Sequence, residues 1–176
     1  MSARNRFGLF LALLAALCAG AATAASVDTN YLPETDFSHY RTYHWVVVHD
    51  APEIDNITDQ QIKRAVDKQL QAKGWTRAES KEADVYVACQ VAIENRTEVT
   101  MYGGWGWYGG AHSSERRYEV GTLTVDVYDP KIEKLVWRGS ATDTLKSKST
   151  PEKRQARLDK AMTKLFKDFP PRPKNK

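Results

Sequence analysis

The feature that most constrains the fold of this chain is a run of alternating side chains over residues 85–93. Positions 85, 87, 89, 91 and 93 hold Val, Val, Cys, Val and Ile, with Tyr, Ala, Gln and Ala between them. Because successive side chains of a strand point to opposite faces, the run predicts a strand with one face on the core. Cys89 is therefore expected to be a small buried residue, whereas a reactive thiolate needs partial exposure and a nearby base.

Three further strands are predicted from similar patterns. Residues 40–48 are rich in β-branched and aromatic side chains, which predicts a strand covered on both faces. Residues 123–127 and 135–141 form two more apolar runs, and Asp129-Pro130 begins a turn of about five residues between them. These two strands are expected to form a hairpin.

A first helix is expected to begin at Thr58, whose hydroxyl would cap it. Gln61 would complete a capping box, and Ile57 and Ile62 stand at the positions of a hydrophobic staple. Gly74 would end the helix in the left-handed conformation. The apolar face consists of Ile62, Ala65, Val66 and Leu70.

A second helix is expected near the end of the chain, with Thr150 as its cap and Pro151 at its first position. Pro170-Pro171 would stop it. Its apolar stripe consists of Leu158, Ala161, Met162, Leu165, Phe166 and Phe169.

The order of these elements is strand, helix, strand, strand, strand, helix. It predicts a single α+β domain, a four-stranded and mainly antiparallel sheet with two helices packed on it. We place this domain at residues 40–171, after an N-terminal extension at 25–39 and before a basic tail at 172–176. The 41% of apolar and 10% of aromatic residues exclude a disordered chain, and two cysteines exclude a disulfide scaffold.

The first 24 residues have the pattern of an export signal. Arg4 and Arg6 precede an apolar run from Leu9 to Cys18, and small residues follow up to Ala24. The run is shorter than the roughly 20 residues that a membrane-spanning helix needs. We expect cleavage near Ala24 and residence in the periplasm or cell envelope.

Cys18 offers an alternative, because a bacterial lipoprotein cysteine stands at such a place. Leu17 occupies the position where a lipoprotein site has a small residue, which favours the soluble form. An outer-membrane lipoprotein remains the alternative, and association with the membrane is expected only if Cys18 is lipidated.

The basic character of the chain is weak evidence for nucleic acid, and no nucleic-acid partner is expected. Loss of Arg4 and Arg6 would lower the formal charge from +4 to about +2. The remaining excess lies in the last third, which predicts either a solvated helix face or contact with anionic lipid or polymer. Its basic residues before the tail are Lys146, Lys148, Lys153, Arg154, Arg157, Lys160, Lys164 and Lys167.

No catalytic residue, metal site or cofactor is expected. His39, His44 and His49 recur every five residues, and this odd spacing places neighbours on opposite faces of a strand. Asp126 shares its face with Thr124 and Tyr128, which indicates a polar outer face of the sheet. Carboxylates that an acid/base pair would need stand at Asp84, Asp126, Asp129 and Asp143, but a sequence does not show whether they converge.

Residues 101–110 form the most unusual segment, in which aromatic residues alternate with glycines. It has no lysine or following helix of a phosphate loop. The rings would either fold back onto the sheet or offer flat faces to a partner. The candidate partner-binding residues are Tyr102, Trp105, Trp107, Tyr108, Arg116 and Arg117.

Several motifs, taken in order, resemble a bacterial family known as the domain of unknown function 4136. They are residues 36–45 (DFSHYRTYHW), 65–67 (AVD), 73–75 (KGW), 82–85 (EADV), the Gly/Trp/Tyr segment, 121–126 (GTLTVD), 135–139 (LVWRG) and 169–171 (FPP). The resemblance covers residues 31–171. It implies a small envelope protein, often a lipoprotein, without established activity or catalytic residues.

We therefore expect a non-enzymatic binding or structural domain of the cell envelope, with an envelope protein or polymer as its partner. One alternative is an envelope hydrolase acting on glycan or peptide, which requires converging carboxylates or a Ser/His pair. Another is a membrane-surface protein held by a lipid on Cys18.

Overall fold

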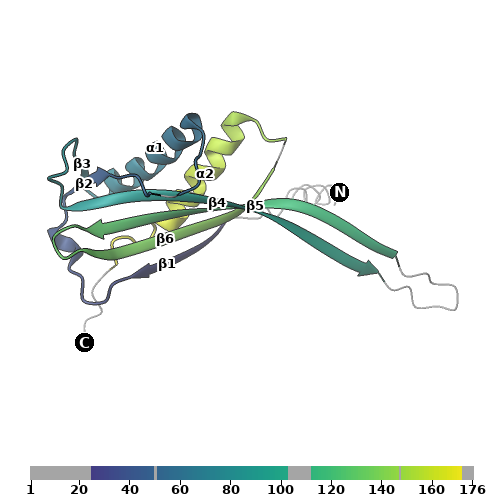
Figure 1. The fold of residues 1–176 in the computed structure, drawn as a ribbon, viewed down its shortest axis with the longest axis horizontal. Coiled ribbons are helices and arrows are strands. Elements are labelled where there is room, and N and C mark those ends of the chain that lie inside the picture. Colours follow the sequence, from purple (N-terminus) through teal and green to yellow (C-terminus); the bar gives the residue numbers. More distant parts are fainter. Residues whose placement is uncertain (1–24, 50, 103–111, 147, 172–176) are drawn as a thin grey trace, which may run out of the picture.

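The computed structural model describes residues 25–49, 51–102, 112–146 and 148–171. It is a six-stranded sheet with two helices on one face (Figure 1). The strand order is β1-β6-β5-β4-β2-β3. The elements are β1 (Ser26–Tyr31), a 3-10 turn (Phe37–His39), β2 (Thr42–Trp45), α1 (Asn56–Ala72), β3 (Thr76–Arg77), β4 (Val85–Tyr102), β5 (His112–Asp129), β6 (Lys134–Leu145) and α2 (Pro151–Leu165).

The single α+β domain with two helices on a sheet is confirmed, but the prediction of four strands is wrong. Strand β1 lies in the range expected to be an extension and pairs antiparallel with β6. The short strand β3 pairs parallel with β2, and β2 pairs parallel with β4. The sheet is therefore mixed: β1, β6, β5 and β4 pair antiparallel, and β4, β2 and β3 pair parallel at one edge.

The segment between the predicted strands at 85–93 and 123–127 also consists mostly of strand. β4 continues to Tyr102 and β5 begins at His112, so each has 18 residues. They pair without a register shift from Tyr86 opposite Tyr128 to Tyr102 opposite His112. The hairpin of β5 and β6 around Asp129-Pro130 is confirmed.

Helix α1 begins earlier than the sequence predicts. Asp55, not Thr58, is the N-cap, and its Oδ1 accepts a hydrogen bond of 2.9 Å from the Thr58 N–H. Ile57 is 71% exposed and forms no staple, because the earlier start places it on the solvent side of the first turn. The predicted apolar face is buried, and Gly74 has a φ of +84° after the last turn.

Helix α2 begins as predicted but ends at Leu165, before the predicted stop at Pro170-Pro171. Thr150 is its N-cap, with Pro151 at the first position. The predicted stripe is buried except for Leu158, which is partly buried against the same core.

The core between the sheet and the helices contains a cluster of aromatic rings at the end of α2. The Trp137 ring lies 4.9 Å from that of Phe169 and 5.2 Å from that of Phe166, measured between centroids. Trp75 lies 5.1 Å from Phe169 in an edge-on arrangement. Such edge-to-face pairs stabilise a core beyond simple burial.

The other face of the sheet is polar, as predicted for Asp126. The Asp126 carboxylate accepts two hydrogen bonds from the Arg138 guanidinium, at 2.6 and 2.7 Å. Further hydroxyl pairs connect β5 to β6 on this face, namely Thr122 with Thr142 and Thr124 with Ser140.

We predict that Gly139→Ala lowers the free energy of unfolding by about 1–3 kcal/mol, the usual effect of overpacking a core. A Cβ at position 139 would overlap the buried Trp137 ring and approach Leu165 at 2.9 Å. Urea denaturation followed by Trp fluorescence measures the change.

Gly121→Ala is the matched control within the same sheet. Its Cβ would meet the end of the Leu145 side chain at 3.0 Å, and Leu145 is 40% exposed and free to move. If both variants lost the same free energy of unfolding, the effect of Gly139→Ala would not come from a clash with the Trp137 ring.

Candidate interaction arm

The candidate site is a two-stranded arm that projects from the body of the domain (Figure 1). We define the arm as residues 96–102 of β4 and 112–118 of β5, which pair with one another. β6 reaches only to Leu145, opposite Glu119, so the arm continues as two strands without a third.

The arm has little core of its own. Its described side chains are exposed except for Thr100 and Tyr118, which are half-buried. Val99 is 59% exposed on the arm, and Ile93 is 60% exposed at its base. Because a two-stranded ribbon alone is only marginally stable in water, the arm is suited to pack against another molecule.

Charges of both signs lie along the arm. Arg96 contacts Glu94 at 3.1 Å, and Arg117 contacts Glu115 at 3.0 Å. Glu98 stands directly opposite Arg116 in the register. Exposed ion pairs of this kind contribute at most about 1 kcal/mol each to stability, so they serve solubility and recognition more than folding.

The structure locates two of the six predicted binding residues in full. Arg116 and Arg117 both lie on the arm, but as neighbours in a strand they point to opposite faces and form no single cluster. Tyr102 ends β4, and its side chain is outside the described part. Trp105, Trp107, Tyr108 and Cys18 lie outside the described residues.

Two exposed apolar residues of β4, Ile93 and Val99, were not predicted as binding residues. They share the face that carries Val85 and Val87 into the core, and they lie beyond Val91, which is half-buried against that core. The signal was present, because the alternation that starts at Val85 has the same parity as Val99.

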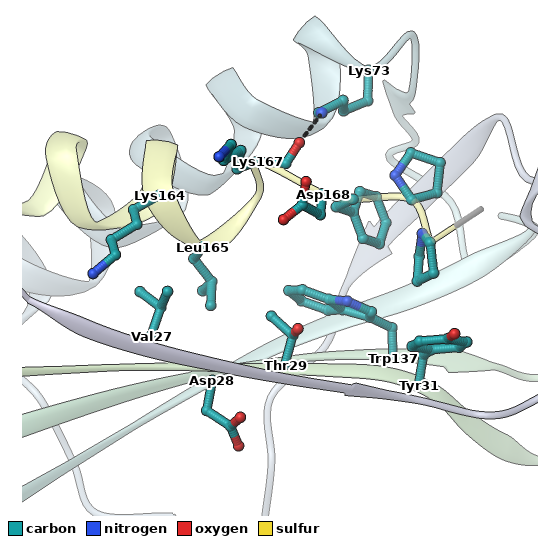
Figure 2. A pocket seen from close by; sticks show the side chains of 13 residues that line it. Val27, Asp28, Thr29, Tyr31, Lys73, Trp137, Lys164, Leu165, Lys167 and Asp168 are labelled. Carbon is teal, nitrogen blue, oxygen red and sulfur yellow. Dashed lines mark hydrogen bonds between the residues drawn. The ribbon is translucent and has the colours of Figure 1, made fainter.

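A groove of about 1040 Å³ lies between β1 and the end of α2 (Figure 2). Lys164 donates to the Ala25 carbonyl at 2.8 Å, and Lys73 donates to the Lys167 carbonyl at 3.2 Å. Asp28 and Asp168 also line the groove. Its lining therefore has mixed charge, and two of its three lysines already bind main-chain oxygens, so the geometry indicates no particular ligand.

The four candidate carboxylates each have structural hydrogen-bond partners. Asp84 accepts the main-chain N–H groups of Arg41 and Thr42, both at 2.9 Å, and these bonds hold the pKa of Asp84 below its usual value. Asp129 accepts from the Tyr40 hydroxyl at 2.7 Å. Asp126 binds Arg138, as described above, and Asp143 binds Arg157.

The histidines and Cys89 are likewise engaged locally. The exposed His39 contacts Asp36 at 2.9 Å, while Nδ1 of His44 lies 3.0 Å from the Ala78 carbonyl. Burial, together with the charge of Asp126, raises the pKa of the half-buried Cys89 thiol, which keeps it protonated at neutral pH. Within the described ranges, no group of three His, Cys, Asp or Glu residues is placed to hold a metal ion.

The body with its projecting arm defines a small α+β domain. Residues 27–171 match the family model described as "Domain of unknown function (DUF4136)", and the chain belongs to this family. The resemblance inferred from the sequence motifs is thus confirmed. No protein of curated function matches the chain.

Two solved structures share the fold at low sequence identity. A PDZ domain protein from Parabacteroides distasonis has 12% identity and a TM-score of 0.54 over 85% of this chain, which spans only 37% of that protein. PelC from Paraburkholderia phytofirmans, described as a dodecamer, has 16% identity and a TM-score of 0.50 over 81% of this chain and 94% of its own. Neither described helix of this chain is long and apolar enough to cross a membrane.

We predict that the body folds without the arm. Replacing residues 97–117 by Asn-Gly would connect Arg96 to Tyr118, which are opposite one another, through a tight turn. The removed residues with described side chains contribute none of the buried core, so the melting temperature should change by no more than about 2–4 °C, the effect of roughly 1 kcal/mol on a domain of about 150 residues. A loss of cooperative thermal unfolding by circular dichroism would show that the arm belongs to the folding unit.

Proposed function

We propose that this chain is an exported, non-enzymatic binding domain of the bacterial cell envelope that holds its partner through the arm. The observation that carries the proposal is the arm itself, a long paired ribbon exposed on both faces. An element with so few buried contacts adds little to the stability of the body, which favours a role in recognition.

Export is supported by the leader pattern before Ala24. Cleavage there would leave Ala25 directly before β1, and the Ala25 carbonyl accepts a hydrogen bond from Lys164. The cleaved chain would keep every element of the sheet. Lipidation at Cys18 would instead leave the residues between Cys18 and Ala25 as a tether before β1.

A binding role is also supported by the state of the polar groups. The described carboxylates that an acid/base mechanism would use are held by main-chain N–H groups, a tyrosine hydroxyl or arginines. A general acid or base must be free to exchange a proton with a substrate. The hydrolase alternative would have to break these bonds.

We predict that a photoreactive amino acid in place of Glu98 or Arg116 forms a discrete covalent adduct when the full chain is expressed in its native host. Both side chains are exposed on the arm. The readout is a shifted band after illumination, followed by mass spectrometry of the adduct and of the processed N-terminus.

The matched control carries the same amino acid at Lys160, which is exposed on α2. Adducts from the arm positions but not from position 160, in a periplasmic or membrane fraction, are the expected result. An arm without adducts, or a chain retained in the cytoplasm, would overturn the proposal. The N-terminal mass also distinguishes a start at Ala25 from an acylated Cys18.

A further inference from the structure

We propose that the partner of the arm is a second copy of this chain, which pairs antiparallel with the first through residues 91–99 of β4, that is, through the base of the arm (91–95) and the first residues of the arm itself (96–99). This inference rests on the proposed function of the arm and names its occupant. It follows from three observations on β4, namely a free strand edge, a self-complementary charge pattern and apolar residues that meet in the same register.

The edge of β4 is open over most of its length. β2 pairs with β4 only at residues 85–87, and the Val46 N–H adds one hydrogen bond to the Val87 carbonyl. From Cys89 onward, β4 pairs only with β5 among the described residues. The segment 89–102 contains no proline, and its pairing with β5 has no bulge, so two devices that commonly block edge pairing are absent from it. Its charged residues Glu94, Arg96 and Glu98 do discourage the pairing of most strands and leave only registers in which opposite charges meet.

The opposite edge of the sheet, β1, is protected at both ends. The Ala25 carbonyl accepts from Lys164, and the Tyr31 N–H donates to the Asn30 side chain at 2.9 Å. No described side chain is hydrogen-bonded to the main chain of β4 beyond Cys89. The structure therefore favours β4 over β1 as the edge that accepts another strand.

The contact between β2 and β4 shows which residues of β4 direct their main-chain N–H and C=O groups away from β5. Since the Val87 carbonyl faces β2, every second residue from there presents its N–H and C=O away from β5. In an antiparallel pair of β4 strands, these residues would form the hydrogen-bonded pairs. They are Val91, Ile93, Asn95, Thr97 and Val99.

Charge selects among the registers that this geometry allows. With Asn95 opposite Asn95 of the second copy, Glu94 faces Arg96 of the other chain twice, in close non-hydrogen-bonded pairs. Shifting the centre by one residue either way places Glu94 opposite Glu94, or Arg96 opposite Arg96. If Thr97 instead lies opposite Thr97 of the second copy, Arg96 of each chain faces Glu98 of the other, and the charges again attract.

The partner of Val99 favours the centre at Asn95 over that at Thr97. With Asn95 at the centre, Val99 faces Val91 of the second copy, and Ile93 faces Thr97. With Thr97 at the centre, Val99 faces the polar Asn95, while Ile93 faces Met101. Val99 is 59% exposed in the single chain, and the register centred on Asn95 is the one that gives it an apolar partner.

The test begins with the mass of the wild-type full chain by light scattering, and a dimer is expected. Asn95→Cys is then introduced with Cys18→Ala and Cys89→Ala. Directly opposite hydrogen-bonded residues have Cα atoms about 5.5 Å apart, within the range of a disulfide. Mild oxidation should link most of the chains in pairs.

Thr97→Cys in the same background is the control, because the two positions would lie more than about 13 Å apart along the strands. Arg96→Glu should weaken the dimer about tenfold through like charges. Adding Glu94→Arg should restore it in the register centred on Asn95 but not in that centred on Thr97.

A monomer at every concentration, or crosslinking at Thr97→Cys in place of Asn95→Cys, would overturn the inference. Photoadducts from the arm to a different envelope protein, in a chain that stays monomeric, would overturn it while upholding the proposed function. Absence of any arm adduct would overturn both.

Discussion

Trp137 joins three parts of the molecule, because its ring packs against Phe166 and Phe169 after α2 while extending over Gly139 in β6. β6 in turn lies between β1 and β5, so the position of this ring fixes the end of α2 relative to the centre of the sheet. Phe169 continues the contact to Trp75, after α1. The body is thus closed at one end by aromatic packing, which leaves the other end of the long β4–β5 ribbon without a helix above it.

The parts of the fold that bury side chains were predictable, and those held only by main-chain pairing were not. The apolar faces of α1 and α2 and the strands at 85–93 and 123–127 follow from hydrophobic periodicity. In β1, Val27 is the only aliphatic residue, so its strand state depends on the β6 edge beside it. The start of α1 was misplaced because Asp55 and Thr58 are both good caps, and only the local backbone decides between them.

In the candidate site, too, some features could be predicted from the sequence and others depend on strand pairing. Arg116 and Arg117 were predicted as binding residues from their place beside the aromatic segment, and the structure puts them on the arm. Their strand geometry, which separates them onto opposite faces, was hidden because residues 94–102 and 112–120 lack clean alternation. The register that pairs Glu98 with Arg116 is a property of the hairpin as a whole, and short sequence windows do not contain it.

Arm and body also differ in what keeps them ordered, and this difference bears on specificity. The body is stabilised by burial, which is insensitive to small changes of charge. The edge of β4 carries Glu94, Arg96 and Glu98 on one face, so a strand that adds there must present the complementary order of charges. This edge of mixed charge thereby disfavours most strands, while the exposed Val99 favours the register in which Val91 of the added strand lies opposite it. Selectivity then comes from electrostatics and affinity from apolar burial, without any contribution from the core that folds the domain.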